Sequence, residues 1–389
     1  MINLENDFNR KNQDSKAKLK QVFEFANDRP AYVINDVNYW TFGENLDDIP
    51  EEYYSDNPQV SMDYQIRKIK RHYEHFHEDS YIGFLHPWFG TGVLASGFGT
   101  PIVFNYKSDP AVDISKIETI EEVKKLELPN PGKDGIMPKV INALRYYKDH
   151  CDLVVGITDS QGPLTTALSV VGYDKFCYWM YDYPRVIHEF MDKVTEALIQ
   201  WVRFQKELAG VPMESESYPL GVRLPEGYGG AWLSDDDAVI LPADLYREFV
   251  VPYNSKFLKA FGGGCIHYCG TATQHIENYC STDGLTAVHN MNLDNLGEAK
   301  KMREAVTRKG IVYMAGDFIP NDYRMETYYR DLLEAMGSAE GLIVVPYVAP
   351  AIQLEDGKYE QAQRNQLELG KKVRDILRKE LDSRLKVTV

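Results

Sequence analysis

The chain has 389 residues, of which 44% are hydrophobic and 26% are charged. This composition is typical of a globular protein, and the length suffices for one large domain or two smaller ones. Acidic residues outnumber basic ones by 58 to 43, which gives a formal net charge of −15. A field of this sign repels nucleic-acid phosphates and anionic lipid surfaces, so we expect no nucleic acid and no membrane among the partners.

The N-terminal segment MINLENDFNRKNQDSKAKLK is polar and contains no apolar run that could serve as a secretory signal. Nowhere does the sequence approach the ~18 consecutive apolar residues of a membrane helix, and we therefore expect a cytoplasmic protein. The cysteines are odd in number and sparse, which argues against a disulfide framework. They are Cys151, Cys177, Cys265, Cys269 and Cys280, and three of them fall within one short stretch.

Eight apolar segments rich in Val, Ile and Tyr recur along the chain, the later ones separated by segments with helical spacing. They are AYVIND from Ala31, SYIGFLHPW from Ser80, DLVVGITDS from Asp152, SYPLGVRL from Ser217, GCIHYCG from Gly264, LTAVHNMN from Leu285, IVYMAGDF from Ile311 and GLIVVPYV from Gly341. Eight βα units predict an α/β protein with a single (β/α)₈ TIM barrel. A doubly wound sheet is the alternative, but no G-x-G-x-x-G follows the first strand.

Helical additions are expected at both ends of this barrel. The spacing predicts an N-terminal helix over Asn12–Asn27, an added segment over Trp40–Phe76 and a C-terminal helix over Tyr359–Leu385. The whole chain, 1–389, is then one domain, with 1–78 as the N-terminal extension and first βα unit. His72, His75 and His77 lie in a polar amphipathic segment, so we expect them on a solvated helix face rather than around a metal.

In such a barrel the reactive side chains lie where strands end and βα loops begin. The predicted strand ends carry Asn35 and Asp36, His86 and Trp88, Asp159 and Ser160, Arg223 and Glu226, His267 and Cys269, His289 and Asn290, Asp317, and Tyr347.

The fifth of these ends has the most specific pattern. In Cys265-Ile-His267-Tyr-Cys269, alternation along a strand directs the two thiols and the imidazole to one face. Thiolates and imidazole are zinc ligands, and a site with three protein ligands and one open position is catalytic in kind. The plainer interpretation makes the cysteines small buried hydrophobes and His267 a hydrogen-bonded core residue.

The stretch from Gly229 to Gly270, GGAWLSDDDAVILPADLYREFVVPYNSKFLKAFGGGCIHYCG, resembles the uroporphyrinogen decarboxylase superfamily in its acidic turn, F-x-x-P-Y segment and strand ending in H-x-C-G. Upstream, ITDSQGPLTTALSVVGYDKF from Ile157 is similar to the superfamily's G-P-[FL]-T segment. Downstream, MAGDFIP from Met314 takes the place of its G-N-V-D-P turn. The resemblance covers Asp152 to the C-terminus, with the N-terminal third matching in outline, and it implies a (β/α)₈ barrel.

Two activities are known in this superfamily. The decarboxylases act without cofactor on a tetrapyrrole with eight carboxylates, held by arginines of an R-Q-A-G-R motif. The corresponding region here reads RPAYVINDVNYW and lacks the second arginine, and Arg223 is the one arginine at a predicted strand end. A polyanionic tetrapyrrole would therefore be poorly compensated.

The methyltransferases transfer methyl groups between a small methylated substrate or thiol and a corrinoid protein. Their zinc is held by the H-x-C pair and a cysteine after the eighth strand. His267 and Cys269 match the pair, but no cysteine follows the eighth strand here. Cys265 lies ~13 Å from Cys269 along a regular strand, too far to share one zinc with it. The third ligand is expected among Asp317, Tyr347 and Glu355.

The remaining candidates follow from their places at strand ends. Asp159, His289 and Asp317 are expected to be catalytic, and His86, Trp88, Gln161, Arg223, Tyr268 and Tyr347 are expected to bind substrate. Aromatic side chains at the mouth would suit an aromatic methyl ether or a methylated amine, or would pack the rim; they are Trp88, Phe89, Tyr228, Trp232, Tyr268 and Tyr347. The run Ser234-Asp235-Asp236-Asp237 is expected to cap the following helix or face solvent, unless one carboxylate orients a metal-bound histidine or the substrate.

The sequence thus predicts a zinc-dependent methyltransferase with a small-molecule substrate and a corrinoid-carrying partner protein, because the chain has no D-x-H-x-x-G segment to bind cobalt itself. Two alternatives stay open. One is a cofactor-free decarboxylase of the uroporphyrinogen type, and the other is a non-catalytic barrel that binds a ligand or partner.

Overall fold

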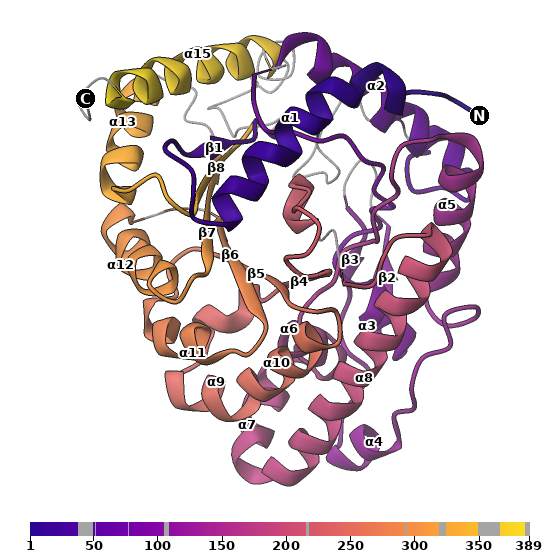
Figure 1. The fold of residues 1–389 in the computed structure, drawn as a ribbon. Coiled ribbons are helices and arrows are strands. Elements are labelled where there is room, and N and C mark those ends of the chain that lie inside the picture. Colours follow the sequence, from indigo (N-terminus) through magenta and orange to yellow (C-terminus); the bar gives the residue numbers. More distant parts are fainter. Residues whose placement is uncertain are drawn as a thin grey trace, which may run out of the picture.

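The computed structural model describes residues 1–37, 50, 52–76, 78–104, 109–214, 218–291, 293, 295–318, 324–348 and 366–385. Six parallel strands form the main sheet in the order β1-β8-β7-β6-β5-β4 (Figure 1). They are β1 (Ala31–Tyr32), β4 (Ala231–Ser234), β5 (Gly264–Cys269), β6 (Leu285–Met291), β7 (Val312–Phe318) and β8 (Leu342–Tyr347). The short strands β2 (Ile102–Val103) and β3 (Ala111–Val112) form a separate antiparallel pair.

Two further extended segments close the sheet into a barrel. The segment around Leu85 pairs in parallel with Val155, and Gln161 at the end of the second segment pairs in parallel with Ser234 of β4. On the other side, the backbone N–H of Ser80 donates to the Tyr32 carbonyl of β1 at 2.8 Å. The eight-membered ring confirms the predicted (β/α)₈ class, with single bridges in place of regular ladders at the second and third positions.

The predicted fourth strand, SYPLGVRL, is wrong. Residues Pro219–Gly221 form a 3-10 turn in which Leu220 and Gly221 have φ values of 41° and 87°, and a strand does not adopt such angles. The fourth strand is β4, which begins after two glycines. A Cβ on Gly229 would lie 2.1 Å from the Gly263 backbone, so glycine is needed where β4 approaches β5.

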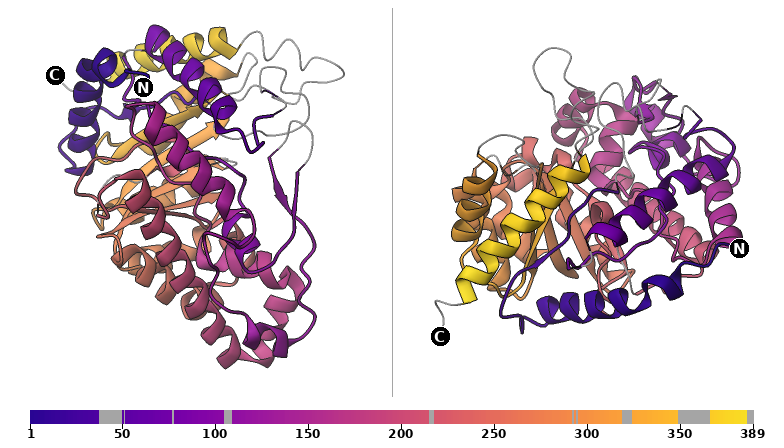
Figure 2. Two further views of the ribbon diagram at one scale, coloured as in Figure 1. Left: turned by 90° about the vertical axis from the view of Figure 1, so that its right-hand side faces the viewer. Right: turned by 90° about the horizontal axis from the view of Figure 1, so that it is seen from above.

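Helices surround this barrel, and further helices precede its first strand and follow its last strand in the chain (Figures 1 and 2). Those in the N-terminal half are α1 (Glu5–Phe23), α2 (Pro58–His75), α3 (Val93–Gly97), α4 (Ile120–Lys125), α5 (Met137–His150), α6 (Pro163–Val171), α7 (Tyr173–Asp182) and α8 (Pro184–Ala209). Those in the C-terminal half are α9 (Ala243–Phe249), α10 (Val251–Lys259), α11 (Ile276–Ser281), α12 (Leu296–Thr307), α13 (Met325–Met336) and α15 (Gln366–Leu385). Their apolar sides and the strands share one buried core.

The predicted terminal helices are present with shifted bounds. The N-terminal helix α1 begins at Glu5 rather than Asn12, and α15 covers the described part of the predicted C-terminal helix. Of the predicted segment Trp40–Phe76, helix α2 covers the second half, while 40–49 lie outside the described residues, as do His77 and 359–365.

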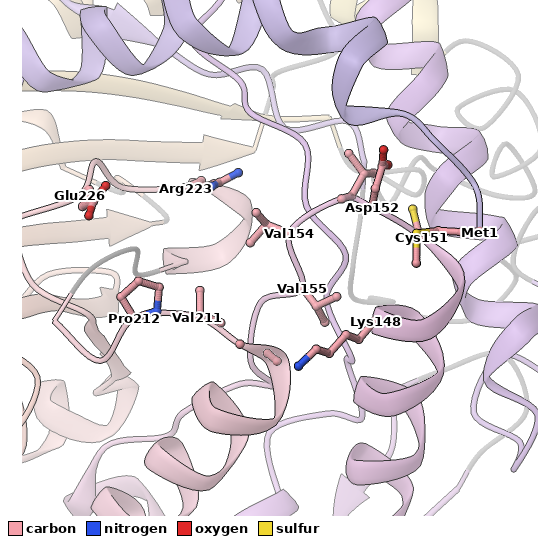
Figure 3. A pocket seen from close by; sticks show the side chains of 13 residues that line it. Met1, Lys148, Cys151, Asp152, Val154, Val155, Val211, Pro212, Arg223 and Glu226 are labelled. Atoms are coloured by element: carbon pink, nitrogen blue, oxygen red, sulfur yellow. The ribbon is translucent and has the colours of Figure 1, made fainter.

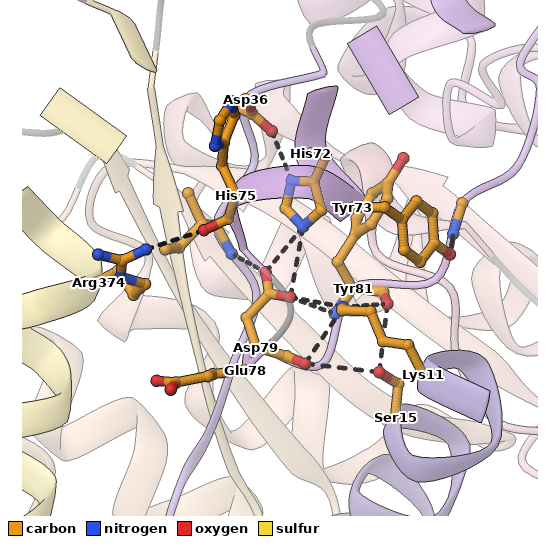
Figure 4. Close-up of polar contacts among 12 residues, drawn as sticks. Lys11, Ser15, Asp36, His72, Tyr73, His75, Glu78, Asp79, Tyr81 and Arg374 are labelled. Carbon is orange, nitrogen blue, oxygen red and sulfur yellow. Dashed lines mark hydrogen bonds and ion pairs between the residues drawn. The ribbon is translucent and has the colours of Figure 1, made fainter. Parts of the chain in front are cut away.

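His72 is not on a solvated face, and that prediction is wrong. Its ring is buried on α2, with Nδ1 2.6 Å from the Asp36 carboxylate and Nε2 3.2 Å from Asp79 (Figure 4). Lys11 of α1 also pairs with Asp79, at 2.8 Å. A polar residue can occupy the inner face of a helix when partners of this kind satisfy it, which the apolar periodicity of the sequence does not reveal.

Candidate metal centre

Three potential metal ligands converge at the carboxyl ends of β4 and β5. They are one carboxylate oxygen of Asp236, the His267 imidazole and the Cys269 thiol, whose donor atoms all lie within 4.8 Å of one another. His267 Nε2 is 3.2 Å from Asp236 Oδ1 and 3.6 Å from Cys269 Sγ. Strand alternation places His267 and Cys269 on the same face of β5, as the sequence predicted.

The loop after β4 delivers Asp236 to this point. The last residue pair between β4 and β5 is Ser234 with His267. The backbone N–H of the next residue, Asp235, donates to the His267 carbonyl at 2.7 Å, so the hydrogen bonding between the two strands continues by one residue. The buried Asp235 carboxylate accepts hydrogen bonds from the Tyr246 hydroxyl of α9 and from Asn254 Nδ2 of α10. Asp235 is thus an anchor, and the next residue lies beside the end of β5.

The separations of His267 from the other two side chains match those of a tetrahedral zinc ion. With zinc bonds of 2.0 to 2.3 Å, two tetrahedral ligands lie about 3.3 Å apart for N and O and about 3.6 Å apart for N and S. The observed separations of 3.2 and 3.6 Å agree with these values. Asp236 Oδ1 is buried and faces His267 Nε2, so its negative charge is compensated from within the cluster, as it would be by a cation bound there.

The cluster is accessible from one side. The Asp236 side chain is 39% exposed, whereas that of His267 is 3% exposed. Three protein ligands with one open side are the arrangement of a catalytic rather than a structural zinc site.

Asp236 and His267 each favour the charged form of the other. Burial opposes ionisation of Asp236, but the facing His267 and hydrogen bonds to His267 and Cys269 lower its pKa. Burial likewise disfavours the charged form of His267, but Asp236 raises the His267 pKa to about 10. Burial raises the pKa of the Cys269 thiol. A bound cation would replace the proton shared by these groups and keep the thiol ionised.

His289 lies directly behind His267. The two residues are register partners on β5 and β6, and their Nδ1 atoms are 2.9 Å apart. On its other side, His289 Nε2 is 3.1 Å from the Tyr347 hydroxyl. Burial, and then the charge of His267, lowers the pKa of His289 well below its usual range, so this ring is neutral.

Asp159 is a further buried carboxylate near the cluster. Burial raises its pKa to about 7, and the fields of Asp236 and His267 both act on it. Its Oδ2 accepts a hydrogen bond from Gln161 Nε2 at 2.5 Å, and Oδ1 has no hydrogen-bond partner. Asp159 and its partner Gln161 therefore lie near Asp236 and His267, and their roles remain predictions.

Tyr268 and Asp317 have the wrong strand parity for the site. Tyr268 is on the outer face of β5, where its ring stacks on Tyr279 of α11. Asp317 on the outer face of β7 accepts hydrogen bonds from its neighbour's backbone N–H and from the Tyr328 hydroxyl of α13. Their positions do not support the substrate-binding role expected for Tyr268 or the catalytic and ligand roles expected for Asp317.

The second strand places His86 and Trp88 close together. Their rings stack with centroids 5.8 Å apart, and Trp88 Nε1 donates to Asp109 at 2.8 Å. Burial lowers the pKa of His86 to about 3. His86 is therefore neutral, and its role in substrate binding remains a prediction.

Arg223 lies at the other end of the barrel. It lines a cavity of about 380 Å³ with Cys151, Asp152 and Glu226, which precede the third strand and β4 (Figure 3). Parallel strands present their amino ends there, whereas the Asp236–His267–Cys269 cluster is at their carboxyl ends. The structure therefore does not place Arg223 at the candidate site, because the segment that carries it is not a strand.

Asp236 is a candidate ligand that the sequence does not single out. It belongs to an acidic run expected to cap a helix, face solvent or orient a metal-bound histidine, and the residues expected as third ligand are Asp317, Tyr347 and Glu355. Asp317 faces α13, Tyr347 contacts His289, and Glu355 lies outside the described residues. The signal that would have found it is AWLS followed by three aspartates, had AWLS been recognised as the fourth strand.

Fold and site together define a βα barrel with a candidate zinc centre at the carboxyl ends of its strands. Residues 56–213 match the uroporphyrinogen decarboxylase (URO-D) family, which confirms the resemblance seen in the sequence and extends it into the N-terminal third. Among solved structures, the fold is similar to that of a methyltransferase from Methanosarcina mazei, with a TM-score of 0.63 and 17% identity over 91% of this chain and 98% of that one. No curated protein sequence matches the chain.

Within the described part of the chain, none of the helices combines the length and apolar character needed to span a bilayer.

Proposed function

We propose that this protein is a zinc-dependent methyltransferase that moves a methyl group between a small methylated substrate or a thiol and a corrinoid protein. The observation that carries the proposal is the Asp236–His267–Cys269 cluster, whose spacing and chemistry fit one zinc ion with an open side. The similarity to the methyltransferase from Methanosarcina mazei and the URO-D match support the class of enzyme.

The side chains have distinct roles in this proposal. Asp236, His267 and Cys269 hold the metal, which would supply Lewis acidity and lower the pKa of a thiol or other group at its open position. Asp159, a buried carboxyl near Asp236 and His267, would hold or move a proton beside that position. Gln161 orients Asp159 through its hydrogen bond to Oδ2.

The corrinoid partner is part of the same proposal. The sequence contains no D-x-H-x-x-G segment for binding cobalt, so the cofactor would be carried by a separate protein. An assay with free cob(I)alamin in place of that protein tests this part of the proposal, because the cobalamin spectrum reports methylation by a panel of methylated ethers, amines and thiols.

Zinc analysis of the purified protein and of two cysteine variants tests the proposal. We expect one zinc per chain in the wild type, loss of zinc and of methyl transfer in Cys269→Ala, and neither loss in Cys280→Ala. Cys280 is a matched control because it is a partly buried free cysteine on α11. Absence of zinc from the wild type after loading, or zinc unaffected by Cys269→Ala, would refute the metal centre.

A second candidate, cofactor-free decarboxylation, is favoured by Asp159, since a buried carboxyl with a pKa near 7 is suited to proton transfer. Its test is turnover of a porphyrinogen in the absence of metal. Activity that is abolished by Asp159→Asn and retained by Cys269→Ala would favour this reaction over methyl transfer.

A further inference from the structure

Behind the metal cluster, a chain of hydrogen bonds runs through the barrel interior. It passes from His267 Nδ1 to His289 Nδ1 at 2.9 Å, from His289 Nε2 to the Tyr347 hydroxyl at 3.1 Å, and from that hydroxyl to the Leu220 carbonyl at 3.2 Å. His289 is 0% exposed and Tyr347 is 1% exposed. Both side chains are therefore enclosed by the protein, although both were expected to act on or bind substrate.

The hydrogens of this chain can be assigned in one direction. Two ring nitrogens 2.9 Å apart need one hydrogen between them, and an imidazole that binds metal through Nε2 keeps its hydrogen on Nδ1. His267 Nδ1–H then donates to His289 Nδ1, His289 Nε2–H donates to the Tyr347 oxygen, and the Tyr347 hydroxyl donates to the Leu220 carbonyl. The opposite direction would leave the Tyr347 and Leu220 oxygens 3.2 Å apart with no hydrogen between them.

The end of the chain is fixed by an unusual backbone conformation. Leu220 has φ 41° and ψ 53°, in the left-handed region that residues other than glycine rarely occupy. Its carbonyl also accepts a hydrogen bond from Asn35 Nδ2 at 2.7 Å. The turn thus presents one carbonyl oxygen to the barrel interior, where both Asn35 and Tyr347 donate to it.

Glycine at position 316 leaves room for the pair in the middle of the chain. A Cβ on Gly316 of β7 would lie 2.6 Å from His289 Nε2 and 3.0 Å from the Tyr347 ring. The contact between the two side chains therefore depends on a missing side chain on the neighbouring strand.

We infer that His289 and Tyr347 are positioning residues, which hold His267 in the tautomer and orientation that direct its Nε2 lone pair at the metal position between Asp236 and Cys269. This inference rests on the proposed zinc centre. The partner of a metal-bound histidine fixes its tautomer and raises its affinity for the metal, and here a second histidine, 2.9 Å away, takes the place of the usual carboxylate or backbone carbonyl.

Competition of the full-length protein with a chromogenic chelator for zinc tests the inference. We expect His289→Leu to bind zinc about 10- to 100-fold more weakly than the wild type. His289→Asn keeps an acceptor near the Nδ1 position and is expected to recover part of this loss. Tyr347→Phe removes only the hydroxyl and is expected to weaken zinc binding about fivefold.

Tyr268→Phe is the matched control for Tyr347→Phe. Tyr268 is an equally buried tyrosine, but it lies on the outer face of β5 and outside this chain of hydrogen bonds. Its variant is expected to bind zinc as the wild type does. Wild-type zinc affinity in both His289→Leu and Tyr347→Phe would overturn the inference.

The nitrogen chemical shifts of histidine give a readout that does not depend on metal. In the metal-free wild type at neutral pH, we expect His289 to carry its hydrogen on Nε2, with the signal assigned by its loss in His289→Asn. A hydrogen on Nδ1 of His289 would overturn the inference. A wild type that shows the expected tautomer but binds no zinc would refute the proposed function and leave the hydrogen-bond chain established.

Discussion

At the scale of single residues, two cysteines of the same strand differ in burial and therefore in their expected roles. Cys265 is 0% exposed, and burial raises the pKa of its thiol far above the ordinary value. Cys269, four residues further along β5 and on the same inner face, is partly exposed and contacts His267. The first is a core residue and the second is a candidate ligand.

Asp159 gives a prediction in which the sign of a pH effect is fixed by burial. Its pKa is about 7 in the folded protein against 3.8 ordinarily, so ionisation favours the unfolded chain between these values. Asp159→Asn is therefore expected to stabilise the metal-free protein by about 4 kcal/mol at pH 8 and to have little effect at pH 4. Urea denaturation at both pH values measures this difference, and an effect independent of pH would contradict it.

At the scale of elements, buried charges attach α1 and α2 to the strands. Asp36 follows β1, Asp79 precedes the second strand, and His72 of α2 lies between their carboxylates (Figure 4). Lys11 of α1 completes the network through Asp79. Burial opposes the charge on His72, but Asp79 and Asp36 raise the pKa of His72 above 6.5. Burial also opposes ionisation of Asp79, but Lys11 and His72 lower the pKa of Asp79 below 3.8.

The network predicts a pH window for stability. The stability that a charged His72 adds is complete below about pH 6.5 and is lost as pH rises through its higher pKa in the folded state. The stability that an ionised Asp79 adds is present above about pH 3.8 and is lost as pH falls through its lower pKa in the folded state. His72→Asn is expected to cost about 3–5 kcal/mol within this window and less at higher pH. Denaturation across pH measures the cost, with the exposed His150→Asn as control. A constant cost from pH 5 to pH 9 would exclude a charged His72.

Gly316→Ala gives a prediction at the level of strand packing. The added methyl group would displace His289 and Tyr347, so we expect zinc affinity to fall about tenfold or more while the fold is retained. The control is Gly132→Ala, where the nearest atom would be 3.5 Å away. Equal zinc affinity in Gly316→Ala, Gly132→Ala and the wild type would show that the His289–Tyr347 contact does not support the metal centre.

At the scale of the whole molecule, the apolar segments of the sequence predicted the barrel because seven of the eight predicted segments contain a strand or an extended segment of it. SYPLGVRL has the same apolar content as a strand, but Pro219 and Gly221 form a tight turn within it. The real fourth strand, AWLS, is too short for periodicity to distinguish. That one error moved the fourth strand end from Asp235 and Asp236 to Arg223, so Asp236 was not among the residues predicted as the third ligand.

Position at a strand end also predicted site residues that the fold does not direct into the barrel interior. His267, Cys269, His289 and Tyr347 share the inner face, whereas Tyr268 and Asp317 occupy alternate positions that face the helices. A strand end identifies the right edge of the sheet, but only the parity within the strand identifies the right face. For β5, the H-x-C pattern supplied that parity, and for β7 nothing in the sequence did.

Anomalous scattering at the zinc edge, from a crystal of the zinc-loaded protein, tests the central claim most directly. The account predicts one strong peak per chain, bonded to Asp236, His267 and Cys269 with a fourth position open to the mouth of the barrel. No peak at this position, or a zinc ion held there without Asp236, would contradict it.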